Sequence, residues 1–201
     1  MQVEPGLRER KKLQTRQAIY DAARRLFADR GFQNVTVAEV ARAANVSEVT
    51  VFNYFPNKED LFYAGMRFFE EELLEAVRRR KPDESALKAF RRKLLESTDG
   101  LRSPERFATI KKATDAYAGS PSLAAREREI VEGYTRQLAE LLAEGEPDVE
   151  DSAVAAALMG AHRALVDHVR RRVREGVRGE ELADEARSQI RRAFGRLERG
   201  L

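Results

Sequence analysis

The fold is decided by residues 36–61, which read TVAEVARAANVSEVTVFNYFPNKEDL. Thr36 stands before the first apolar residue and Glu39 follows three positions later, a spacing typical of the capping box that opens a helix. The apolar side chains then recur with helical period, at Val37, Val40, Ala41 and Ala44. This stretch therefore predicts a short amphipathic helix over residues 37–44.

A tight turn and a second short helix follow. Asn45 tolerates the left-handed conformation better than most residues other than glycine, and Ser47 is well suited to cap a new helix. Pro56 cannot continue a helix, so the second helix is expected over residues 48–54. Two short helices joined in this way form a helix-turn-helix, the geometry that lays its second helix in the major groove of DNA.

Helices are also expected on both sides of this motif. Residues 14–29 repeat apolar side chains at helical spacing and are followed by Gly31, a common helix stop. Asn57 can cap a helix that starts at Lys58 and runs through the basic stretch before Pro82. Turn residues separate the later helices, which are expected at about residues 84–98, 104–118, 121–144, 149–175 and 179–198. No strand pattern is present, so the sequence predicts an all-α fold of about nine helices.

A family resemblance rests on four matching segments, namely Thr15-Arg16, Ala22 to Phe32, Thr36 to Ala41, and Val46 to Leu61. With these segments, residues 15–62 resemble the DNA-binding domain of the TetR family of bacterial transcriptional regulators. The resemblance implies an N-terminal three-helix DNA-binding domain at residues 1–57 and a C-terminal helical ligand-binding and dimerisation domain at residues 58–201. It also implies a repressor that binds a palindromic operator as a homodimer and is released by a small-molecule ligand.

The resemblance further implies which side chains meet DNA. Thr36, Tyr54 and Lys58 stand at positions that contact phosphate in the family. The outward residues of the second short helix are candidates for base readout, since asparagine suits adenine, glutamate suits the cytosine amino group, and threonine or valine suits the thymine methyl group. These readout candidates are Ser47, Glu48, Val49, Thr50 and Asn53.

The contact surface departs from the family pattern at two positions. Val49 stands where the family often has glycine, and Phe52 stands where it usually has a tyrosine whose hydroxyl meets a phosphate. Phenylalanine cannot donate that hydrogen bond. The base preference of relatives is therefore not expected to transfer to this chain.

In the family, the last two long helices form the dimer. Here small residues concentrate on one of them, at Ala153, Ala156, Ala157, Gly160, Ala161 and Ala164. The last helix carries an apolar stripe of Leu182, Ala186, Ile190, Ala193, Phe194 and Leu197. Such helices can form a four-helix bundle between two subunits or an ordinary core within one chain.

A small effector would bind between apolar walls that carry a few polar groups. The candidate ligand-binding residues are Met66, Phe69, Phe90, Phe107, Tyr117, Tyr134, Met159 and His162. Each of them can instead belong to the core, because aromatic residues at helical spacing are commonly buried. His162 and His168 lie six residues apart, on different faces of a helix, and this argues against a shared metal.

Composition narrows the function classes. The 201 residues contain no cysteine, and 35% of them are charged. No apolar segment approaches the length of a membrane span or of a secretory signal, so a cytoplasmic location is expected. Because neither a P-loop, a dinucleotide fingerprint, a nucleophile motif nor paired Glu-x-x-His sequences occur, we expect no enzyme activity, no cofactor and no metal. A ligand-independent regulator and an architectural DNA-binding protein remain as alternatives.

The charge distribution is more informative than the net charge of +3. The first thirty residues are rich in cations, which include Arg8, Arg10, Lys11, Lys12 and Arg16. This start can be a basic arm that contacts phosphates or the minor groove, or simply a solvated beginning of a helix.

Overall fold

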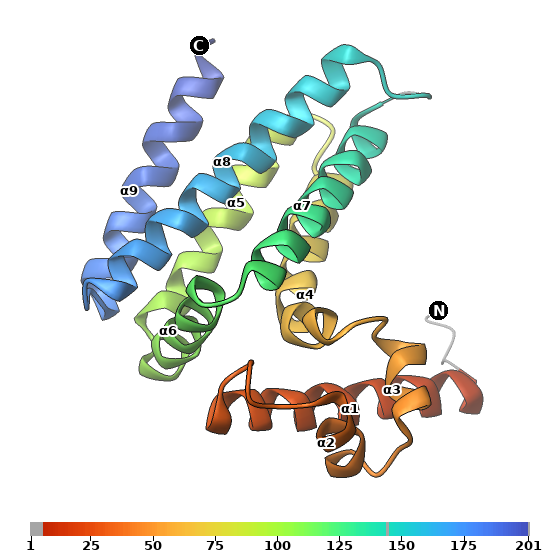
Figure 1. Ribbon diagram of the computed structural model, residues 1–201. Helices are drawn as coiled ribbons and strands as arrows, with labels where there is room; N and C mark the ends of the chain where they lie inside the picture. Colours follow the sequence, from red (N-terminus) through yellow and green to blue (C-terminus); the bar gives the residue numbers. More distant parts are fainter. Residues whose placement is uncertain (1–5, 144, 201) are drawn as a thin grey trace. The chain divides into compact units, whose positions relative to one another are not determined.

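The computed structural model describes residues 6–143 and 145–200, apart from the side chains of residues 7, 66 and 68. These residues form α-helices, one short 3-10 helix and no strand, which confirms the all-α prediction (Figure 1). The N-terminal helices are α1 (Leu7–Arg30), α2 (Val37–Ala43), α3 (Glu48–Tyr54) and α4 (Lys58–Arg78). The later elements are α5 (Ala86–Ser97), η1 (Thr98–Arg102), α6 (Pro104–Ala118), α7 (Pro121–Leu142), α8 (Val149–Arg174) and α9 (Gly179–Glu198).

Two compact units divide the chain, Met1–Met66 and Arg67–Leu201. The division falls inside α4, so this helix contributes residues to both units. The boundary expected from the sequence, between residues 57 and 58, lies earlier, at the start of α4. As a division of function it remains a prediction.

In the first unit α2 packs against α1, and α3 packs against α2. Its core contains small and β-branched residues that allow close helix contact, together with one aromatic ring. The buried members are Ile19, Ala22, Ala23, Val35, Val40, Ala41, Val51, Phe55 and Leu61. Three further rings, those of Phe27, Phe32 and Phe62, contact one another with centroids 5.3 to 6.4 Å apart.

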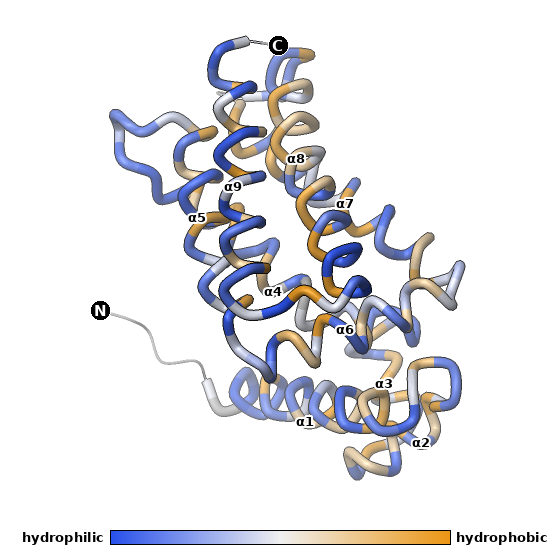
Figure 2. The backbone as a smooth tube through the Cα atoms, turned by 90° about the vertical axis from the view of Figure 1, so that its left-hand side faces the viewer, coloured by the Kyte–Doolittle hydropathy of each residue, from blue (hydrophilic) through white to orange (hydrophobic). Residues whose placement is uncertain are grey.

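The second unit is a helical bundle in which α8 contacts α6, α7 and α9, while α5 packs on α9. Phe90 of α5 and Phe194 of α9 are buried and stack with centroids 6.1 Å apart. Figure 2 shows that α8 carries many apolar residues along its length, whereas α9 is mainly hydrophilic. Among the described residues, no helix combines the length and apolarity needed to cross a membrane.

The apolar stripe predicted on the last helix is mostly used within the chain. Leu182, Ala186, Ile190 and Phe194 are buried in the second unit, and Ala193 is exposed. The small residues predicted on α8 behave differently, since most of them face solvent. The exposed ones are Ala153, Ala156, Ala157, Gly160 and Ala164. The apolar stripe of α9 thus belongs mostly to the core of the chain, whereas most of the small residues of α8 lie on its surface.

Several helix boundaries differ from the sequence prediction, including those of α5, α4 and α1. The helix expected to start near residue 84 starts at Ala86, because Ser85 caps it through a hydrogen bond from the Lys88 N–H. α4 ends at Arg78, before the basic stretch is complete. The third difference is at α1, which starts earlier than expected, at Leu7.

Candidate nucleic-acid interface

The start of α2 is fixed by the capping box that the sequence predicts. The Thr36 side chain accepts a hydrogen bond from the Glu39 N–H, and the Thr36 N–H donates to Glu39 Oε2 at 2.8 Å. Arg30, at the end of α1, donates to Glu39 Oε1 at 2.7 Å. These hydrogen bonds lower the pKa of Glu39 to about 2. The carboxylate therefore stays charged and links the end of α1 to the start of α2.

The turn between α2 and α3 has the left-handed residue that the sequence predicts. Asn45 has φ of 55°. The Val46 N–H donates to the Ala41 carbonyl at 3.0 Å and the Asn45 N–H donates to the Arg42 carbonyl at 3.2 Å, the paired bonds of a Schellman motif. A β-branched residue in place of Asn45 would strain this turn. The turn sets the direction in which α3 leaves α2.

α3 is buried along one side only. Val51 is fully buried and Ser47 caps the helix, accepting the Thr50 N–H at 3.1 Å. The opposite side exposes the predicted readout residues Glu48, Val49 and Asn53, and Val49 is 69% exposed. Phe52 is also exposed, at 45%. A short helix that presents valine, phenylalanine and asparagine to solvent has a surface suited to a partner with both apolar and hydrogen-bonding groups, which the edges of bases provide.

The residues predicted to contact phosphates differ in their exposure to solvent. The exposed Thr36 donates its hydroxyl to Glu39 Oε2 at 2.9 Å, so a phosphate would have to replace that bond. Tyr54 is half-buried. The Lys58 ammonium lies 4.3 Å from the centroid of the Phe32 ring, and burial lowers its pKa. The ring therefore holds the Lys58 ammonium near the first turn of α4.

The cationic start of the chain is helical over the described residues, and its contact with phosphates or the minor groove stays a prediction. α1 begins at Leu7, directly after Gly6, and neither glycine nor proline interrupts the helix between residues 7 and 14. The prediction of a helix over residues 14–29 did not use this lack of glycine and proline, and it therefore placed the start of the helix too late. Cations therefore stand on an exposed helical surface, in the group Arg8, Arg10, Lys11, Lys12 and Arg16.

A hollow of about 770 Å³ in the first unit joins this surface to α3. α1 and α3 contribute its two sides. The lining residues are Arg8, Glu9, Lys11, Lys12 and Thr15 from α1 and Thr50, Asn53 and Tyr54 from α3. Cations on one side and readout candidates on the other make this hollow a place where a polyanion can meet both kinds of group. The sequence predicted that the cations at the start of the chain can contact phosphates, but it did not place them beside α3.

The predicted ligand-binding residues lie in several surroundings of the second unit. The ring centroids of Phe69 and His162 are 5.7 Å apart, and the centroid of the Tyr117 ring lies 4.2 Å from the Arg170 guanidinium carbon. The Tyr134 hydroxyl donates to the Arg67 carbonyl at 3.2 Å. Met159 is buried, Phe107 is half-buried, and Phe90 belongs to the stack with Phe194. The side chain of Met66 lies outside the described residues.

Comparison with known proteins identifies the first unit most directly. Residues 19–64 match the family model described as bacterial regulatory proteins, tetR family. The HTH-type transcriptional regulator TcmR of Streptomyces glaucescens is 34% identical over 86 residues, which are 43% of this chain and 38% of TcmR. Two other curated relatives are likewise matched over about half of their length. The sequence likeness thus centres on the helix-turn-helix.

Solved structures resemble the whole chain in fold. NalD of Pseudomonas aeruginosa, the secondary repressor of a multidrug efflux pump, has a TM-score of 0.56 and 20% identity, covering 92% of this chain and 96% of NalD. The SmeT–triclosan complex has a TM-score of 0.59 and 16% identity, covering 90% of each chain. At these identities the likeness concerns the fold, which extends over both units.

Proposed function

Because the chain belongs to the TetR family of bacterial regulatory proteins, we propose that it is a transcriptional repressor that binds a palindromic operator as a homodimer and releases it on binding a small molecule. The observation that carries this proposal is the surface of the first unit, where the exposed side of α3 and the cationic start of α1 border one hollow. Phosphate contacts position such a protein, and contacts with base edges give it specificity.

In this proposal α3 enters the major groove and Asn53 reads adenine through two hydrogen bonds. Glu48 accepts from a cytosine amino group, and Val49 with Thr50 contacts thymine methyl groups. Ser47 serves first as the cap of α3 and contacts DNA from that position. Thr36, Tyr54 and Lys58 contact phosphates beside the groove, while the cations of α1 extend the phosphate contact.

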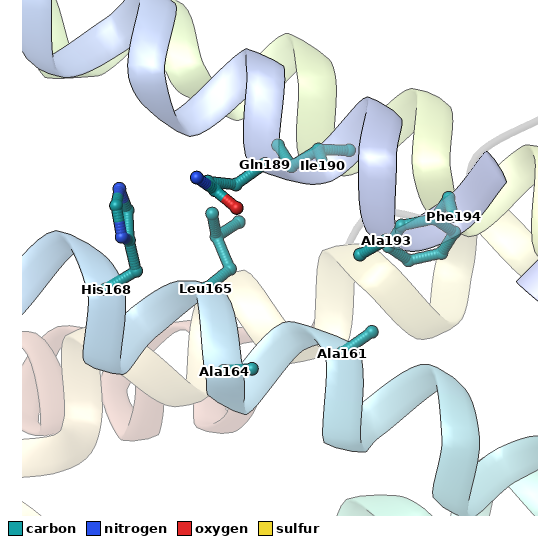
Figure 3. A pocket seen from close by; sticks show the side chains of 8 residues that line it. All are labelled: Ala161, Ala164, Leu165, His168, Gln189, Ile190, Ala193 and Phe194. Atoms are coloured by element: carbon teal, nitrogen blue, oxygen red, sulfur yellow. The ribbon is translucent and has the colours of Figure 1, made fainter. Parts of the chain in front are cut away.

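The exposed small residues of α8 support the homodimer. A second copy can approach closely there, because alanine and glycine leave little side chain between the helices. A hollow of about 90 Å³ lies next to this surface, between α8 and α9 (Figure 3). It is lined by Ala161, Ala164, Leu165, His168, Gln189, Ile190, Ala193 and Phe194. In a twofold dimer this hollow would receive side chains from the partner, and two recognition helices about 34–36 Å apart would meet successive major grooves.

The small-molecule part of the proposal draws on relatives. SmeT was solved in complex with triclosan. We assign the corresponding role in this chain to the second unit, among the predicted residues Phe69, Tyr117, Tyr134, Met159 and His162. Phe90 and Phe107, as well as Met66, stay predictions for the same pocket.

The test is selection of bound sequences from random duplexes by the full-length protein, at several stated salt concentrations. We expect one enriched site with two inverted halves, and we expect Asn53→Ala to weaken the preference at one base pair of each half, by about 1–3 kcal/mol. Uniform binding to all duplexes would contradict specific regulation and favour an architectural DNA-binding protein. An enriched site that no small molecule dissociates would favour a ligand-independent regulator.

The cations of α1 lead to a separate prediction about salt. Replacing both Lys11 and Lys12 with alanine is expected to weaken binding by a similar factor for every duplex, because phosphate contacts carry no sequence information. The slope of log K against log salt concentration should fall by about 1 for each phosphate that the variant no longer neutralises. Filter binding or fluorescence anisotropy over a salt series measures both quantities.

Arg24→Ala is the matched control, since Arg24 is an exposed cation of α1 outside the hollow. Its salt slope should stay at the wild-type value. Equal slopes for the double variant and the wild-type protein would remove α1 from the interface.

A further inference from the structure

Five ionisable side chains gather in the interior of the second unit. They are Glu70 on α4, Glu127 and Tyr134 on α7, and His162 and Arg170 on α8, and we call them the interior polar cluster. The charge of Glu127 acts on both Glu70 and His162, and the charge of Glu70 acts on Tyr134. Glu70 is 2% exposed, Glu127 4%, and Tyr134 and His162 5% each. Burying ionisable groups costs free energy unless partners satisfy them, so each partner matters.

One carboxylate of the cluster is satisfied by the chain itself. Arg170 donates to both oxygens of Glu127, at 2.9 and 2.7 Å. The Arg170 guanidinium also stacks over the Tyr117 ring at 4.2 Å. A buried carboxylate in this unit is thus held by a planar cation that lies on an aromatic face.

The second carboxylate lacks such a partner. Glu70 Oε2 is buried without a hydrogen bond among the described residues. Burial, reinforced by the charge of Glu127 on α7, raises the pKa of Glu70 to about 8. On its own helix Arg67 opposes this shift and Glu71 adds to it. Near neutral pH, Glu70 is therefore a largely protonated acid that would ionise if a cation came into contact with it.

The interior polar cluster also contains a neutral imidazole, which lies against an aromatic ring. The rings of Phe69, on α4, and His162 have their centroids 5.7 Å apart. His162 Nδ1 has no hydrogen-bond partner within the described part of the chain. Burial lowers the pKa of His162 to about 4, so the ring is neutral and can accept a proton donor at neutral pH. Glu70 and His162 thus each bury a polar atom without a hydrogen-bond partner among the described residues, and the charge of Glu127 acts on both residues.

We propose that the interior polar cluster is the effector site and that its ligand is a small organic cation, an amine or amidine on an aromatic body, whose N–H groups pair with Glu70. This inference rests on the proposed function, for which it names the class of effector. The ammonium donates to the Glu70 carboxylate, and the aromatic body lies against Phe69 and His162. The ligand would thus donate hydrogen bonds to the Glu70 carboxylate, as the Arg170 guanidinium does to that of Glu127.

Occupancy of this site has a direct consequence for α4. Glu70 is 2% exposed, so a ligand that reaches its carboxylate must move neighbouring side chains or α4 itself. α4 is one continuous helix from Lys58, a predicted phosphate contact, to Arg78. We therefore expect the ligand to act on α4, the helix that also carries Lys58.

The test uses three probes of nearly equal shape and different charge: 2-phenylethylamine, 2-phenylethanol and phenylacetate. Binding to the full-length protein is measured by isothermal titration calorimetry at probe concentrations up to roughly 1 mM. We expect the cationic amine to bind at least about tenfold more tightly than the neutral alcohol and the anionic acid. Glu70→Gln is expected to weaken the binding of the amine by a similar factor, because glutamine carries no negative charge.

Glu132→Gln is the matched control, since Glu132 is an exposed glutamate of α7 that is not part of the interior polar cluster. It should leave the affinity for the amine unchanged. A second readout is pH: since Glu70 must lose its proton to pair with the amine, affinity should rise roughly tenfold from pH 7 to pH 9. Glu70→Gln should remove that dependence.

Three results would overturn the inference: no binding of the amine, equal affinity for amine and alcohol, or an unchanged affinity in Glu70→Gln. Failure of the proposed function is a different result, because it would be seen as uniform binding in the duplex selection without any probe. A protein that selects one operator and ignores the amine would therefore refute only the effector class.

Discussion

Arg170→Met is expected to lower the free energy of unfolding by about 3–5 kcal/mol, the typical cost of removing one partner from a buried ion pair. The side chain of Glu127 is 5% exposed and that of Arg170 is 14% exposed, so solvent cannot compensate the carboxylate that remains. The substitution also removes the guanidinium from the face of Tyr117. Urea unfolding followed by circular dichroism at several protein concentrations measures the change.

Two further variants separate the charge effect from a packing effect. Arg174→Met replaces an exposed arginine of the same helix and should change the unfolding free energy by no more than about 0.5 kcal/mol. Combining Arg170→Met with Glu127→Leu should recover most of the stability, because no uncompensated charge then stays buried. A single variant as stable as the wild-type protein would mean that Glu127 reaches solvent.

Ala157→Glu is expected to separate the proposed dimer into folded monomers and to weaken operator binding by roughly 100-fold or more, since like charges brought together at an interface cost several kcal/mol. Ala157 is exposed within one chain and lies among the small residues of α8, so the new carboxylate does not disturb the core of the protomer. In a twofold interface each substitution occurs twice, and the two carboxylates face the same patch. Sedimentation velocity and operator binding measure the two effects.

The control is Ala108→Glu, an exposed alanine of α6 outside the α8 surface. It should keep both the sedimentation coefficient and the operator affinity of the wild-type protein. If Ala157→Glu remained dimeric, the dimer would have to use another surface, and the role proposed for α8 would be wrong.

Much of the first unit could be predicted from the sequence because its decisive interactions are local. The capping bonds between Thr36 and Glu39 and between Ser47 and Thr50 each span three residues. Asn45 adopts its left-handed conformation within a turn whose hydrogen bonds close over a few positions. Residue type and spacing are sufficient to predict such interactions.

The cationic surface of α1 could be predicted only in part from the sequence. The cations themselves stand in the sequence, but whether they lie on an arm or on a helix depended on a start signal that is weak at Gly6, where no side chain caps α1. That they face the same hollow as Thr50, Asn53 and Tyr54 follows from the packing of α3 against the rest of the first unit. Spacing within α1 does not contain this information.

The sequence by itself determined the helical fold and the helix-turn-helix, because these depend on periodicity, caps and turns within short segments. Only the tertiary structure decided that α9 supplies core while α8 leaves small residues exposed, since both helices show similar apolar patterns. It alone also paired Glu127 with Arg170, 43 residues apart, and left Glu70 buried beside them. Burial and charge pairing arise from segments distant in the chain, and so the interior polar cluster has no local signature in the sequence.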